Sequence, residues 1–109
     1  MPRYIIQAAY TSAAAAAFVS NPQDRVAGVK ALVEKLGGKL ESFDFCLGEY
    51  DLYAIASVPD DISAAAISLA VNAPGHVKSY KTTRLMSPEE FLDAQKKAHD
   101  LSYQAPTKG

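Results

Sequence analysis

The polar run Gly48-Glu49-Tyr50-Asp51 separates two apolar stretches, residues 43–47 and 52–58. A glycine and three polar residues between strand-like stretches are typical of a hairpin turn, so we predict two antiparallel strands joined at this point. The turn then places a phenol and two carboxylates at one end of a sheet. A loop with an even number of residues, which sets Leu47 opposite Leu52, separates apolar from mixed positions.

This register gives the hairpin two different faces. The predicted core face holds Phe43, Phe45, Leu47, Leu52, Ala54, Ala56 and Val58. The opposite face holds Ser42, Asp44, Cys46, Tyr53, Ile55 and Ser57. The second set mixes polar and apolar groups, which suits a subunit interface or a small cavity better than a dry core.

Outward from the hairpin, the pattern predicts two further strands and four helices. The strands are residues 3–10 and 76–85, both rich in β-formers. Helix start signals occur at Asn21-Pro22, at Pro59-Asp60-Asp61 and at the capping box Ser87-Pro88-Glu89-Glu90. The alanine run 13–17 after Ser12 predicts a short helix, with a loosely held loop as the alternative.

The order of these elements predicts an α+β fold. Strand, helix, strand, strand, helix, strand is the ferredoxin-like βαββαβ plait, a four-stranded antiparallel sheet, here with an added C-terminal helix. Right-handed crossovers place both crossover helices on one face and leave the other face bare. We expect that bare face to meet a partner, a ligand or the added helix, because large exposed apolar patches are a liability.

Composition indicates one globular domain of 109 residues, with residues 1–101 folded and 102–109 as a flexible tail. With 11 basic and 12 acidic residues the net charge is −1, so we expect neither nucleic acid nor a membrane as a partner. The single cysteine, Cys46, has no internal disulfide partner, and no leader or long apolar run is present. We therefore expect a cytoplasmic protein.

Several blocks in order carry a family resemblance. They are Gly37-Gly38-Lys39-Leu40-Glu41-Ser42-Phe43, Gly48-Glu49-Tyr50-Asp51, Val58-Pro59-Asp60, the alanine-rich residues 64–71, and Thr83 through Ser87-Pro88-Glu89-Glu90. Together they resemble the GYD domain family, whose name matches Gly48, Tyr50 and Asp51. The resemblance implies a ferredoxin-like domain similar to the dimeric α/β barrel proteins, in which two sheets face one another, and it implies no established activity.

Six residues are the candidate ligand-binding set: Asp44, Tyr50, Asp51, Tyr53, His76 and Tyr80. His76 is also the candidate catalytic residue, because an imidazole exchanges a proton near neutrality. Each of these six residues also has a simpler structural explanation. A turn aspartate commonly accepts backbone N–H bonds, a tyrosine commonly packs over a loop, and a histidine at a strand end is commonly a cap or an interface residue.

Two functional hypotheses follow. In the first, the chain is a homo-oligomeric binding or interaction module, with any small-molecule ligand held between paired sheets near Asp44, Tyr50, Tyr53 and His76. In the alternative, which the resemblance to some dimeric α/β barrel proteins implies, it is a small cofactor-poor enzyme of the monooxygenase, isomerase or decarboxylase type that acts on an apolar carbonyl or aromatic compound. His76 would then move a proton while Tyr53 or Tyr80 orients the substrate. Haem chemistry like that of some barrel proteins is a further variant, disfavoured by the absence of tryptophan and of a recognisable ligand motif. We expect no cofactor. We also expect no metal site, because the sequence has no zinc-type Cys/His spacing and His76 and His99 are too distant in sequence to form a local helical pair.

Overall fold

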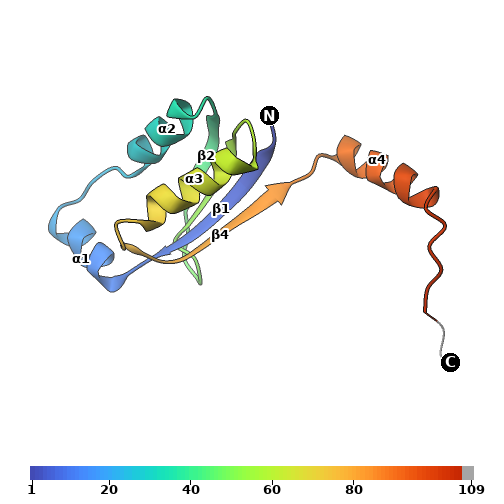
Figure 1. Ribbon diagram of the computed structural model, residues 1–109. Helices are drawn as coiled ribbons and strands as arrows, with labels where there is room; N and C mark the ends of the chain where they lie inside the picture. Colours follow the sequence, from blue (N-terminus) through green and yellow to red (C-terminus); the bar gives the residue numbers. More distant parts are fainter. Residues whose placement is uncertain (107–109) are drawn as a thin grey trace.

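A computed structural model describes residues 1–106, which form four strands and four helices (Figure 1). The elements are β1 (Arg3–Tyr10), α1 (Ser12–Ser20), α2 (Val26–Lys35), β2 (Lys39–Phe45), β3 (Leu52–Ser57), α3 (Asp61–Asn72), β4 (Val77–Leu85) and α4 (Pro88–His99). The sheet has the order β2-β3-β1-β4 with every neighbouring pair antiparallel. The predicted α+β, ferredoxin-like plait is therefore confirmed, with α2 and α3 lying together over one face of the sheet (Figure 1).

The core lies between that face and the two helices. Alternate residues of β1 point into it, because successive strand side chains face opposite sides. The buried residues of this cluster are Tyr4, Ile6, Ala8, Val33, Leu52, Ala54, Ala56, Val58, Ala64 and Ile67. The largest fully buried side chains are Ile67 from α3, Val33 from α2 and Val58 after β3, so each covering helix contributes an anchor.

The hairpin loop has an even number of residues, as predicted, but it is two residues longer than predicted. Phe45, not Leu47, pairs with Leu52, so the loop has six residues, 46–51, and β2 ends two residues early. The loop is still even, so Asp44 and Tyr53 lie on the open face as expected, but they are direct partners, whereas the predicted register sets Asp44 opposite Ile55. The prediction of Leu47 in the core is wrong: this residue is fully exposed in the turn, because the chain has already left the sheet there. Phe45 is also mostly exposed, since it ends a strand at the edge of the sheet.

The start of α2 is the second correction. The pair Asn21-Pro22 predicts the beginning of this helix, but α2 begins at Val26 with Arg25 as its N-cap. Asn21 instead ends α1, donating its backbone N–H to the Ala17 carbonyl at 2.9 Å. The Asp24 carboxylate accepts the Val26 N–H at 2.9 Å and forms the local turn that delays the helix.

One extra residue interrupts the pairing of β1 with β4. Ala9 pairs with Ser79, whereas Tyr10 pairs with Val77, so Lys78 is a bulge residue. From Tyr80 onward, Tyr80, Thr82 and Arg84 pair with Ala8, Ile6 and Tyr4, the helix-side residues of β1. Because of the bulge, Val77 and Tyr80 lie on the same side of the sheet despite their odd spacing.

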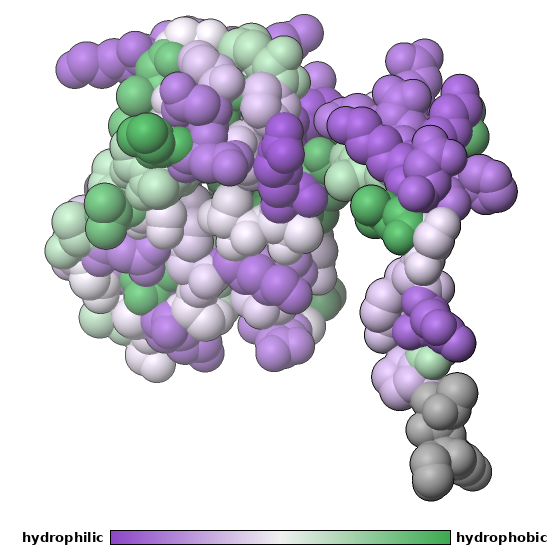
Figure 2. All heavy atoms as spheres, turned by 45° about the vertical axis from the view of Figure 1, so that its right-hand side comes forward, coloured by the Kyte–Doolittle hydropathy of each residue, from purple (hydrophilic) through white to green (hydrophobic). Residues whose placement is uncertain are grey.

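Helix α4 projects away from the body at the end of β4 (Figure 1). No residue of this helix is buried, and the molecule is correspondingly long, 61 × 37 × 22 Å. Figure 2 shows the helix standing clear, with a mostly hydrophilic surface interrupted by hydrophobic atoms. Its capping box is formed as predicted, since Ser87 Oγ accepts the Glu90 N–H and the Glu90 carboxylate accepts the Ser87 N–H, both at 3.0 Å.

Beyond α4, residues 102–106 form neither helix nor strand, and the rest of the predicted tail, 107–109, lies outside the described residues. Of the helices in the described part of the chain, none is long and apolar enough to cross a lipid bilayer.

Candidate functional site

The turn between β2 and β3 is fixed to the neighbouring strand by Asp51. Its carboxylate Oδ2 accepts the backbone N–H of Tyr10 at 2.8 Å, and its own N–H donates to the Ala8 carbonyl at 2.8 Å. Its carbonyl accepts the N–H of Cys46, also at 2.8 Å. Gly48 has φ +138°, a conformation that favours glycine, and allows the loop to fold back. Asp51 thus makes the backbone contacts of a structural turn residue.

Three of the candidate residues lie toward the open face of the sheet, opposite the helices. Asp44 and Tyr53 are cross-strand partners on that face, and Tyr53 is 40% exposed. The Tyr50 ring meets the Tyr53 ring edge to face, with centroids 6.3 Å apart. These three residues form the aromatic and acidic corner of the open face.

The remaining two candidates, His76 and Tyr80, lie on the helix side. Both line a cavity of about 210 Å³ between α2, α3 and the sheet. The structure therefore does not bring His76 together with Asp44 and Tyr53 within one chain, and of the two tyrosines considered for orienting a substrate only Tyr80 shares a cavity with His76.

The cavity has an apolar wall and one polar end. Its apolar lining includes Ile6, Ala8, Val29, Leu32, Phe43, Leu52, Ala54, Ile67, Val71 and Val77. Tyr10, Arg25 and His76 form the polar end, and Tyr80 is the remaining polar side chain of the lining. The rings of Tyr10 and His76 stack with centroids 6.3 Å apart and an interplanar angle of 21°.

Electrostatics link Arg25 with Tyr10. Burial raises the pKa of the Tyr10 phenol, the positive charge of Arg25 lowers it, and the carboxylate of Asp51 raises it again. A guanidinium close to a phenol and an imidazole can bind an anion or polarise a carbonyl group. The imidazole also supplies a group that can donate or accept a proton.

The hydroxyl of Tyr80 is buried and has no hydrogen-bond partner. Burial raises the pKa of this phenol, and the nearby Thr82 hydroxyl offsets part of the rise without completing a hydrogen bond. Leaving a buried hydroxyl unpaired costs free energy, so such a group commonly marks a place where something else binds.

Sequence reasoning missed Tyr10 and Arg25 as site residues. Tyr10 continues the inward alternation of Tyr4, Ile6 and Ala8, so the period of β1 could have identified it. Arg25 was hidden because the sequence pattern places it inside a helix beginning at Pro22, whereas it precedes α2.

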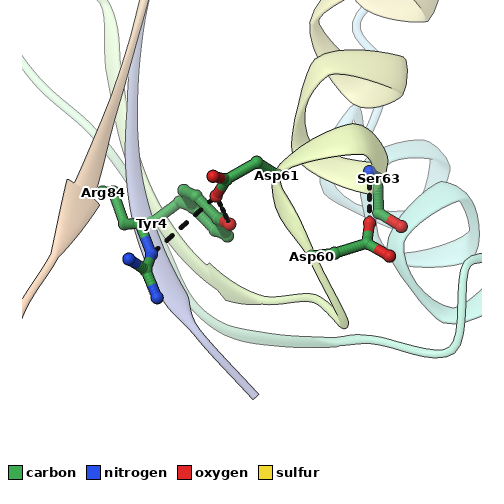
Figure 3. A network of polar contacts seen from close by, with 5 residues as sticks. All are labelled: Tyr4, Asp60, Asp61, Ser63 and Arg84. Atoms are coloured by element: carbon green, nitrogen blue, oxygen red, sulfur yellow. Dashed lines mark hydrogen bonds and ion pairs between the residues drawn. The ribbon is translucent and has the colours of Figure 1, made fainter.

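A polar network occupies the far end of the helix side (Figure 3). The hydroxyl of Tyr4 donates to Oδ1 of Asp61, and Nε of Arg84 lies 3.8 Å from the same oxygen. Burial chiefly, and Asp61 next, raise the pKa of Tyr4, while Arg84 lowers it. The network joins β1, β4 and the first turn of α3, where Asp60 caps the helix by accepting the Ser63 N–H at 2.8 Å.

Among residues 1–106, no three His, Cys, Asp or Glu side chains gather closely enough to hold a metal ion.

The chain matches the family model described as the GYD domain over residues 4–94. A comparison with curated proteins finds no match.

Proposed function

The chain belongs to the GYD domain family, and from that premise we propose that it acts as a homo-oligomeric module that binds a small molecule and assembles through the open faces of its sheets. One observation carries the proposal. Within residues 1–106 both covering helices lie on the same face, and α4 extends outward instead of folding back across the other face (Figure 1).

The composition of the open face fits a subunit interface. Its centre is the cross-strand pair Ile5 and Ile55, both half-buried. Next to this pair runs a row of four residues across the sheet, Asp44, Tyr53, Gln7 and Lys81. An apolar centre with aromatic and polar surroundings is typical of interfaces between separately folded subunits.

The same row supplies charge complementarity. It begins with an acid on β2 and ends with a base on β4, at opposite edges of the sheet. A two-fold axis parallel to the strands lays β2 of one copy over β4 of the other. Asp44 of each copy then faces Lys81 of the other copy. Opposite charges placed in this way favour one register over the others.

Helix α4 offers additional apolar surface for the same contact. Phe91 is 58% exposed and Leu92 is also exposed, and both lie beyond the end of β4. A second copy that covers the open face would lie within reach of this helix. Burial of such side chains stabilises association in proportion to the apolar area removed from water.

Light scattering and sedimentation at micromolar concentration test the assembly. We expect a dimer or a larger oligomer for the wild-type chain, and dissociation for Ile55→Lys on the open face. The matched control is Ile62→Lys on α3, where the side chain is exposed on the outside of the molecule. A monomeric wild-type chain, or equal behaviour of the two variants, would refute the proposal.

A further inference from the structure

The cavity between the helices and the sheet has the size of a small ring-containing molecule. Its volume is about 210 Å³, whereas an engineered apolar cavity of about 150 Å³ holds benzene and drug-sized pockets begin near 300 Å³. A well-packed core contains few voids larger than a water molecule. Small residues leave the space open, among them Ala8, Ala54 and Gly28.

Within residues 1–106, no acidic side chain forms an ion pair with the arginine at the polar end. Arg25 has no carboxylate within ion-pair distance among residues 1–106, and its guanidinium instead donates to Gln23 Oε1 at 3.3 Å. Tyr10 and His76 line the cavity with it. A guanidinium that has no carboxylate partner and lines the cavity with two rings suits a carboxylate ligand, which it can bind through two parallel hydrogen bonds.

Tyr80 lines another part of the same cavity, and its hydroxyl is buried without a hydrogen-bond partner. Tyr80 pairs with Ala8, two residues before Tyr10 along β1, which corresponds to about 7 Å along the strand. A ligand that reaches from Arg25 toward Tyr80 therefore meets a second hydrogen-bonding group at its other end. Pairing with the ligand would remove the cost of leaving the phenol unsatisfied.

We propose that this cavity binds a small monocarboxylic acid with an apolar, ring-sized body and a second polar group opposite the carboxylate. The carboxylate lies at Arg25, the body lies among Ala54 and its apolar neighbours, and the distal polar group bonds to the Tyr80 hydroxyl. This rests on the small-molecule binding proposed above, assigns it a ligand class, and places the ligand on the helix side of each chain, not between paired sheets.

Calorimetric titration with three probes, 4-hydroxybenzoate, benzoate and phenol, tests the assignment. We expect 4-hydroxybenzoate to bind most tightly, benzoate more weakly, and phenol weakest because it lacks the carboxylate. Arg25→Gln should weaken both acids about tenfold or more and leave phenol unchanged, since a hydrogen bond to a charged group is lost. Lys30→Gln, the same charge change at an exposed position of helix α2, is the matched control and should bind like wild type.

Two further variants test the hydrogen bond to the distal polar group of the ligand and the space for its apolar body. Tyr80→Phe should weaken 4-hydroxybenzoate about two- to tenfold and leave benzoate unaffected, because only the hydroxyl is removed. Ala54→Leu should fill the cavity and abolish binding of all three probes, with its fold checked by circular dichroism. If that variant does not fold, the affinities of Tyr80→Phe and Arg25→Gln for the three probes still test the cavity assignment.

The outcomes separate this inference from self-association. No binding of any probe at millimolar concentration, or acid binding unchanged by Arg25→Gln, would overturn the cavity assignment. Binding lost in Ile55→Lys but kept in Arg25→Gln would place the ligand between the sheets and also overturn it, while leaving the proposed module intact. Binding that follows Arg25 and Tyr80 in a chain that light scattering shows to be monomeric would support the cavity and refute the assembly.

Discussion

The carboxylate of Asp51 accepts the backbone N–H of Tyr10 at 2.8 Å, which ties the turn between β2 and β3 to the last residue of β1. That contact connects the two sides of the sheet, because Tyr10 lines the cavity on the helix side while Tyr50, next to Asp51, lies by the open face. The turn therefore positions one end of the proposed ligand cavity from outside it.

Replacing Asp51 should destabilise the fold. Asp51→Ala leaves the partly buried Tyr10 N–H without its acceptor, and we expect a loss of about 1–3 kcal/mol in the free energy of unfolding measured with urea. Asp51→Asn keeps an acceptor oxygen and should lose less. Glu49→Ala, which removes an exposed carboxylate from the same turn, should stay within about 0.5 kcal/mol of wild type. Equal effects at Glu49 and Asp51 would contradict this account.

Gly38 should not tolerate a side chain. A Cβ at this position would lie 2.3 Å from the Ser57 carbonyl oxygen and 2.8 Å from Cγ1 of Val58, at the close approach of β2 to the end of β3. We expect Gly38→Ala to lower stability by about 1–3 kcal/mol in thermal unfolding. Gly28→Ala inside α2 is the control, since a Cβ added there would meet nothing within 4 Å. At that position alanine should stabilise by about 0.5–1 kcal/mol.

Alkaline solution should unfold the protein partly through Tyr4. Burial and Asp61 raise the pKa of this phenol in the folded state, so the unfolded chain releases the proton first, above about pH 10. Stability is fully present below that pH and falls as pH rises toward the folded pKa. In Tyr4→Phe, urea unfolding at several pH values should show a shallower loss over this window. Tyr103→Phe, which removes an exposed phenol, should follow the wild-type curve.

The N-cap of α4 should affect that helix alone. Ser87→Ala removes the hydroxyl that accepts the Glu90 N–H and should weaken the helix by about 1 kcal/mol, seen as faster hydrogen exchange in residues 88–99. The backbone N–H of Ser87 chiefly, and its hydroxyl next, lower the pKa of Glu90, and because the variant loses only the hydroxyl, that pKa should rise only part of the way to its ordinary value. The core should unfold at an unchanged urea midpoint, because no residue of α4 is buried in it. A midpoint shift as large as that of Asp51→Ala would show that α4 packs on the body.

The fold is predictable because its strands and helices carry local signals. The hairpin, the capping box at Ser87 and the alternation of β1 each agree with the structure. The predicted boundaries of the elements are less accurate than the elements themselves. Pro22 carries a start signal for a helix that begins four residues later, because Asp24 forms a turn that competes with it.

The candidate site is less predictable for a related reason. The sequence pattern groups His76 and Tyr80 with Asp44 and Tyr53, although the sheet separates the two pairs. Assigning a strand residue to a face requires the register of its neighbours, and a bulge alters that register without any clear mark in the sequence. An unpartnered hydroxyl such as that of Tyr80 is a property of the packed molecule and has no local signature.

The bulge at Lys78 lies beside Tyr10, so this single position affects the shape of the polar end of the cavity. Deleting that residue would restore uninterrupted alternation between β1 and β4, with Val77 still opposite Tyr10 on the helix side, and would remove the bend and extra twist that a bulge gives a strand. Loss of one codon here would thus change the path by which His76 enters β4, while every strand pairing in the sheet stayed in place. Among descendants of a common ancestor, ligand preference could change at this point without rebuilding the scaffold.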